Sequence, residues 1–135
     1  MDTGVGMYFA KGARGYASRN FRSSEFDCWC KNPQCTVTLI HPRLLERLEM
    51  LRADVGPLAI NRGFSCGPHN LSVGGEDYSF HLFGMAADVR PLEAPFEKFF
   101  DAATGIFEDG GIGGYPDRLH LDVRPLPARW GKFPK

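Results

Sequence analysis

Apolar and polar residues alternate without a break at residues 118–124, and residues 85–90 follow the same period with the small Ala86 at one position of the polar face. Alternation with a period of two is typical of a strand that buries one face. The apolar positions are Met85, Ala87, Val89, Leu119, Leu121 and Val123. The other face carries Ala86, Asp88, Arg90, Arg118, His120, Asp122 and Arg124. We predict two strands whose polar faces lie on the same side of one sheet.

Two further stretches place apolar residues at helical spacing. Residues 41–52 begin with His41-Pro42, where the proline suits a first helical turn, and Gly56-Pro57 is expected to stop the helix. Residues 95–103 form the second predicted helix, which Gly105 is expected to end. The two apolar stripes are Leu44, Leu45, Leu48 and Leu51, and Phe96, Phe99, Phe100 and Ala103. Residues 58–61 predict a short strand, and residues 66–77 a loop.

His81 lies just before the predicted strand at residues 85–90, and Asp88 lies within that strand, seven positions after the histidine. On a helix they would be two turns apart, too far to share an ion. On one straight strand an odd separation would point them to opposite faces. They can meet only if the chain turns between them, and Gly84 permits a turn because glycine tolerates a positive φ.

If the two strands pair with their polar faces together, His81, Asp88 and His120 converge. Two histidines, one carboxylate and an open fourth position describe a catalytic zinc site. The solvated faces of two ordinary strands would give part of this pattern. The complete combination, Ser-x-His-x-x-Gly-x-Ala-x-Asp followed by His-x-Asp, is far more specific.

These paired motifs resemble the zinc D-alanyl-D-alanine carboxypeptidase family of cell-wall peptidases. The zinc fold of that family is shared with murein endopeptidases, phage endolysins and the hedgehog signalling domain. The resemblance runs from about Asn20 to Trp130, and it implies that His81, Asp88 and His120 are the metal ligands. Its other segments are residues 24–28, 60–64, 69–70, 74–75, 111–116 and 129–130.

The hydrolysis that this resemblance implies needs a general base beside a zinc-activated water. Asp117 lies three residues before His120, as in several branches of the family. Asp122 shares a strand face with His120, about 7 Å along the strand, and could instead orient that histidine. We favour Asp122 as part of the site, and the identity of the base stays open.

Three residues are candidates for substrate binding. Ser79 lies two positions before the first histidine and could bond a substrate main-chain group. Family members usually carry an arginine after Ser-Gly-Tyr, but here Arg62 and Ser65 stand in roughly exchanged places. Arg62 either anchors the substrate from this position or forms a surface ion pair. Arg124, like Arg129, offers a bidentate fork to a peptide carboxylate, with surface salt bridges as the alternative.

The chain contains four cysteines, Cys28, Cys30, Cys35 and Cys66. They could form a structural four-thiolate zinc site or disulfides across the chain, and free buried thiols rank below both. Residues 1–11 lack the basic and apolar regions of a secretory signal. The absence of such a signal favours the metal.

Composition narrows the functional classes. The formal net charge is zero, which argues against bulk nucleic-acid binding and against an electrostatic membrane anchor. No apolar run reaches membrane-spanning length. The resemblance, in turn, implies a bacterial or phage protein that acts at the cell wall on the peptidoglycan stem peptide, by an unknown export route, and we expect a monomer.

At 135 residues, the chain is expected to form one domain with its own core. We predict an α+β fold in which a small antiparallel sheet carries the zinc site and packs on two helices. Residues 1–19 are expected to be a flexible arm before a single peptidase domain at 20–135. The resemblance implies a zinc metallopeptidase of the carboxypeptidase or endopeptidase type. The alternatives are a non-catalytic zinc-dependent recognition domain and a structural component of a phage particle.

Overall fold

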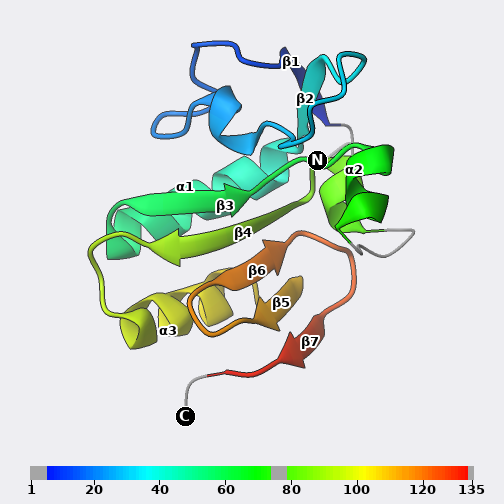
Figure 1. The fold of residues 1–135 in the computed structure, drawn as a ribbon. Coiled ribbons are helices and arrows are strands. Elements are labelled where there is room, and N and C mark those ends of the chain that lie inside the picture. The colour runs from blue at the N-terminus through cyan, green and yellow to red at the C-terminus, as the bar shows by residue number, and fades with distance from the viewer. Residues whose placement is uncertain (1–5, 74–78, 134–135) are drawn as a thin grey trace.

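The computed structural model describes residues 6–73 and 79–133. This part of the chain has an α+β fold with three α-helices and two sheets (Figure 1). The predicted fold class is confirmed. Within the described residues, no helix is long and apolar enough to cross a membrane.

The larger sheet has five strands in the order β3-β4-β6-β5-β7. The strands are β3 (Leu58–Arg62), β4 (Ala86–Pro91), β5 (Gly111–Gly114), β6 (Leu119–Asp122) and β7 (Ala128–Gly131). The pairs β3/β4, β4/β6 and β6/β5 are antiparallel, in keeping with the predicted antiparallel sheet, although no strand was predicted at β5. The edge strand β7 was not predicted, and it pairs parallel to β5.

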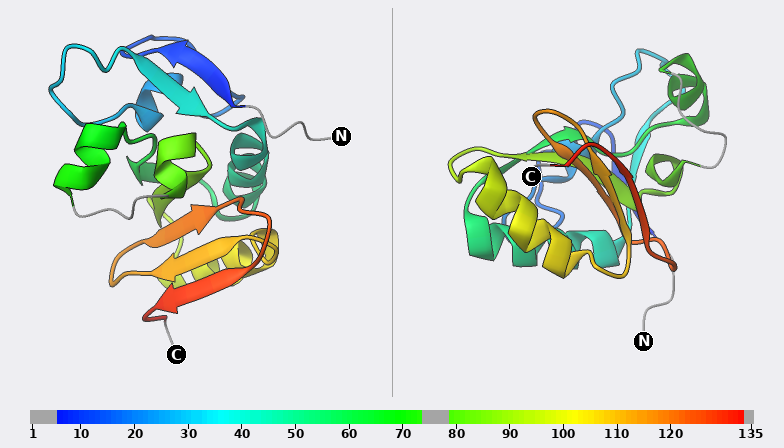
Figure 2. Two further views of the ribbon diagram at one scale, coloured as in Figure 1. Left: turned by 90° about the vertical axis from the view of Figure 1, so that its right-hand side faces the viewer. Right: turned by 90° about the horizontal axis from the view of Figure 1, so that it is seen from below.

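Two helices cover one face of this sheet, α1 (Pro42–Val55) and α3 (Phe96–Ile106) (Figures 1 and 2). The side chain of His41 caps α1 by accepting a hydrogen bond from the Arg43 backbone N–H at 3.1 Å. Helix α3 continues through Gly105, where the sequence predicted its end. The predicted apolar stripe of α1 is buried, and each such leucine contributes about 1.5–3 kcal/mol of transfer free energy.

A second, two-stranded sheet lies near the N-terminus. Strand β1 (Met7–Ala10) pairs antiparallel with β2 (Val37–Ile40), and the 3₁₀ helix η1 (Ser23–Phe26) lies between them in the chain. Strand β1 falls inside the segment 1–19 that was expected to be an arm. The boundary at residue 20 stays a prediction.

Two short helical elements precede the candidate site. Helix α2 (Gly67–Ser72) occupies part of the stretch that was predicted to be a loop, and that prediction was wrong for these six residues. The 3₁₀ helix η2 (Phe80–Phe83) carries the first histidine of the motif. Residues 74–75, which contribute to the family resemblance, lie outside the described residues.

Candidate metal centre

The register of β4 against β6 places the second half of the motif beside the first. Asp88 and His120 are directly opposite each other in this antiparallel pair. Directly opposed residues project from the same face of a sheet. The neighbouring Ala87, Leu119 and Leu121 point into the core on the other face. The predicted convergence of these two residues is therefore confirmed.

His81 reaches the same place through the turn that follows η2. Gly84 caps this element in the left-handed region at φ 67°, and a Cβ there would collide with the Leu39 backbone. The position therefore requires glycine. The His81 ring is held by its Nδ1, which lies 2.8 Å from the Gly63 carbonyl oxygen. That contact turns Nε2 toward Asp88.

The three side chains present one ligand atom each at the spacing of a metal site. Asp88 Oδ1 lies 3.3 Å from His81 Nε2 and 3.3 Å from His120 Nδ1. In a tetrahedral zinc site with bonds of 2.0–2.1 Å, the ligand atoms are about 3.3 Å apart. All three residues are buried, and Asp88 Oδ1 has no hydrogen-bond partner among the described residues. This donor set fits a zinc ion.

The electrostatics of the centre favour a charged carboxylate. Burial by itself would raise the pKa of Asp88, but the His120 and His81 imidazoles hold it well below its usual range. Burial by itself would lower the pKa of His120, but Asp122 and Asp88 raise it. Protons on these imidazoles must leave before their nitrogens can bind a metal.

Asp122 contacts the back of the centre. Its Oδ2 lies 2.7 Å from His120 Nε2, while Oδ1 accepts the Gly111 backbone N–H at 2.9 Å. Arg124 Nη2 donates to the same carboxylate at 2.7 Å. The side chain is fully buried. Asp122 thus occupies the place of a partner that orients a metal-binding histidine.

The two remaining polar candidates on this strand region differ in exposure. Arg124 is paired with Asp122 and stacks over Phe80 and Trp130, at 4.6 and 4.9 Å from the ring centres. The guanidinium charge of Arg124 is therefore used within the protein. Asp117 lies in the turn before β6, 68% exposed, with Arg118 Nη1 at 2.9 Å.

The indole of Trp130 covers the centre from β7. Its ring centre lies 4.9 Å from that of His120. A Cβ on Gly113, the β5 residue opposite, would collide with this indole. Glycine in β5 thus lets Trp130 approach His120 of the candidate centre.

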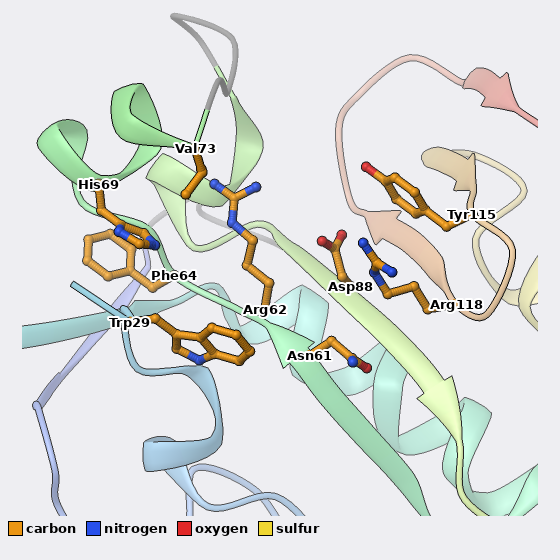
Figure 3. A pocket seen from close by; sticks show the side chains of 9 residues that line it. All are labelled: Trp29, Asn61, Arg62, Phe64, His69, Val73, Asp88, Tyr115 and Arg118. Carbon is orange, nitrogen blue, oxygen red and sulfur yellow. The ribbon is translucent and has the colours of Figure 1, made fainter.

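A cleft of about 410 Å³ opens beside Asp88. Figure 3 shows Asp88 between two walls, with Arg62, His69 and Trp29 on one side and Tyr115 and Arg118 on the other. Arg62 Nη2 donates to Asn70 Oδ1 at 3.1 Å. The predicted Arg62 therefore does line the cleft.

The structure places Ser79 at the cap of η2 and not among the residues that line the cleft. Ser79 caps η2, where its Oγ accepts the His81 backbone N–H at 3.3 Å. Trp29 and Tyr115 line the cleft but were not predicted as site residues. For Trp29, the one signal in the sequence was its position between Cys28 and Cys30. Two cysteines that bind a metal or form disulfides would fix the backbone of the residue between them. Tyr115 had no signal beyond its glycine-rich surroundings.

The four cysteines also converge. All of them are free thiols, and their sulfur atoms lie within 4.8 Å of one another. Within the described residues, this cluster and the His81, Asp88 and His120 centre are the two groups that could hold a metal.

Comparison with known proteins agrees with this geometry. The family model for peptidase M15 matches residues 19–122, which include all three ligands of the centre. A comparison with curated proteins gave no match. Peptidases of this family depend on zinc. Because the match spans most of the chain and contains the complete ligand set, the protein belongs to the peptidase M15 family.

Proposed function

We propose that the protein is a zinc metallopeptidase that hydrolyses peptide bonds in the stem peptides of bacterial peptidoglycan. One observation carries the proposal: a buried carboxylate oxygen without a hydrogen-bond partner faces two imidazole nitrogens at 3.3 Å beside an open cleft. Family membership supports a peptidase that acts on peptidoglycan. Cleavage beside a D-residue is part of the proposal.

The metal would be held by His81 Nε2, Asp88 Oδ1 and His120 Nδ1. Zinc bound there would lower the pKa of water to ~7 and polarise the scissile carbonyl. The Gly63 carbonyl and Asp122 hold the two imidazoles in the orientation that this ligation needs.

Proton transfer is assigned to Asp117, and positioning of His120 to Asp122. Asp122 is fully buried, and His120, Gly111 and Arg124 occupy its oxygens. Asp117 is exposed in the turn that also carries the cleft residues Tyr115 and Arg118. We expect Asp117→Asn to keep its zinc and to lower kcat by about 10²–10⁴-fold. Full turnover in this variant would remove Asp117 from the mechanism.

Substrate anchoring is assigned to Arg62 and Arg118, which lie on opposite sides of Asp88 in the cleft (Figure 3). A guanidinium offers a fork that matches a peptide carboxylate. Arg124 is a poorer candidate than the sequence suggested, since Asp122 neutralises its charge. Ser79 stays a candidate for a main-chain contact.

The place of action is proposed on the same basis. A peptidase for stem peptides must reach the cell wall, so we propose a bacterial or phage protein that acts there as a monomer. Neither nucleic acid nor a membrane is required by this chemistry.

Digestion of purified peptidoglycan, followed by mass spectrometry of the products, tests the function. Release of single D-alanine would identify a carboxypeptidase, and conversion of cross-linked fragments to monomers an endopeptidase. Asp88→Asn should abolish either product. Asp101→Asn, on the exposed side of α3, is the matched control and should retain full activity. A zinc-loaded wild-type protein without any product would favour a recognition domain.

A further inference from the structure

The cysteine cluster has the geometry of a second metal site. Cys66 Sγ lies 3.6 Å from Cys28 Sγ and 3.7 Å from Cys30 Sγ, and all four sulfurs, with Cys35, lie within 4.8 Å of one another. Four thiolates around zinc, with bonds of 2.3 Å, would have sulfurs about 3.8 Å apart. We propose that these four thiolates bind a second, structural divalent ion of the zinc class, and that this ion holds the cleft wall that carries Trp29 and His69.

The distances favour an ion over disulfides. A disulfide joins a sulfur to one partner at about 2.0 Å and leaves the others farther away. Cys66 Sγ instead lies at nearly equal distances from two sulfurs. An ion at the centre of the cluster accounts for this arrangement, because it treats all four ligands alike.

The surroundings suit the charge of such a site. Four thiolates and a divalent ion carry two net negative charges. The Cys66 backbone N–H donates to Cys28 Sγ at 3.3 Å. Lys11 Nζ lies 3.6 Å from Cys30 Sγ and donates to the Cys30 carbonyl at 3.3 Å. Such donors to the ligand atoms stabilise a bound metal.

The cluster links two segments that have little other local structure. Residues 27–36, all of them described, contain neither helix nor strand. Cys66 is the N-cap of α2, which at six residues is too short to be stable alone. Trp29 lies between two ligands, and His69 lies one turn into α2. Both side chains line the cleft (Figure 3).

The consequence for the cleft follows from this connection. Asn70 of α2 is buried and accepts the hydrogen bond from Arg62. If the ion is lost, Trp29, α2 and the Asn70 contact lose their common anchor, whereas the strands that carry the catalytic ligands keep theirs. Loss of the ion should therefore weaken substrate binding in the cleft. This effect rests on the proposed peptidase function, but the metal assignment does not.

Metal content and cobalt spectra test the assignment directly. Wild-type protein should contain two ions per chain, and the cobalt(II) form should show a sulfur-to-metal charge-transfer band. Asp88→Asn should contain one ion and keep the band. Cys35→Ser should contain one ion and lose the band, and Cys66→Ser should behave alike. A Cys35→Ser protein that keeps both the ion count and the band would overturn the assignment.

Thiol titration distinguishes the metal site from disulfides. After unfolding with a chelator and without a reductant, the wild-type protein should show four reactive thiols. Two or fewer would mean disulfides and would overturn the metal site.

Two readouts test the role of the wall. In Trp130→Phe protein, Trp29 is the remaining tryptophan. Its fluorescence anisotropy should fall when Cys35→Ser is added. In kinetics, Cys35→Ser should raise KM about tenfold and change kcat less than twofold. Unchanged anisotropy and KM would show that the ion does not hold the cleft wall. If the wild type binds both ions but cleaves no peptidoglycan, the proposed function fails and the second metal site stands.

Discussion

The two clusters of candidate metal ligands are built in opposite ways. Asp88 and His120 come from paired strands in the sheet, and their separation is set by the β4/β6 register. Three of the four cysteines come from a segment without regular structure, and the fourth comes from the cap of a short helix. The first cluster lies over a hydrophobic core, whereas the second joins two loops.

This contrast separates two uses of a metal. Backbone hydrogen bonds of the sheet and the packing of Leu119 and Leu121 place the histidine and the carboxylate before any ion binds. An ion bound there would not be needed to order the chain and could serve a reaction instead. At the proposed cysteine site, the entropy lost when the loops become ordered must be offset by the free energy of ion binding. Ion binding there therefore contributes to folding.

The largest expected difference is in local order after both ions are removed. In amide hydrogen exchange of the metal-free protein, β4 and β6 should keep most of their protection. Residues 27–36 and α2 should exchange with an opening free energy of about 0 kcal/mol, as mobile loops do. Restoring zinc should recover protection there in wild type but not in Cys35→Ser. Equal loss in both regions would break the comparison.

A smaller effect is expected at the residue behind His120. Asp122→Asn keeps the shape of the side chain but weakens the hydrogen bond that orients the imidazole. Changes of this kind cost about 10–100-fold in metal affinity. Zinc competition titrations measure this change, and Asp117→Asn serves as the control with unchanged affinity. A large loss for Asp117→Asn and none for Asp122→Asn would reverse the two roles.

The turn that carries His81 tests how strongly backbone geometry fixes the proposed metal ligands. Gly84→Ala puts a Cβ into the Leu39 backbone at a positive φ. The left-handed conformation alone costs roughly 1–2 kcal/mol for a residue with a side chain, and the collision adds to it. Denaturant unfolding should show this loss. Gly105→Ala, a helical position with open space, should be neutral or stabilising.

The smallest effect concerns the attachment of the N-terminal segment to α1. Glu49 accepts hydrogen bonds from Ser18 Oγ at 2.6 Å and from the Asn20 backbone N–H at 2.7 Å. Burial opposes ionisation of this carboxyl, but these bonds, above all those from Asn20, lower its pKa from the usual 4.5. The native state therefore gains stability above the unfolded pKa and loses it as the pH falls through the folded value.

We expect Glu49→Gln to cost about 1–2 kcal/mol near neutral pH, in line with hydrogen bonds to charged groups. The difference from wild type should shrink as the pH falls below 4.5, because the carboxyl of the wild type then becomes neutral as well. Unfolding at several pH values measures it. A difference that grows toward acid would contradict the sign.

The sequence by itself determined which three residues meet at the candidate metal centre, and the two strands that carry Asp88 and His120. Side chains on a strand alternate by backbone geometry alone, so parity places Asp88 and His120 on polar faces wherever the strands lie. Gly84 marked the turn for an equally local reason. The two long helices were also predictable, because their apolar stripes recur at helical spacing.

Only the tertiary structure decided the rest, because it depends on contacts between residues far apart in the chain. The gathering of Cys66 with Cys28 and Cys30 joins segments 36 and 38 residues apart, which no local pattern encodes. Strand β7 forms because its four residues meet the free edge of β5. Asp122 is buried because Gly111, eleven positions away, donates its backbone N–H to this carboxylate, and the buried carboxylate then pairs with Arg124, which the sequence had offered to the substrate. Local periodicity fixes the direction of a side chain, and packing fixes its partner.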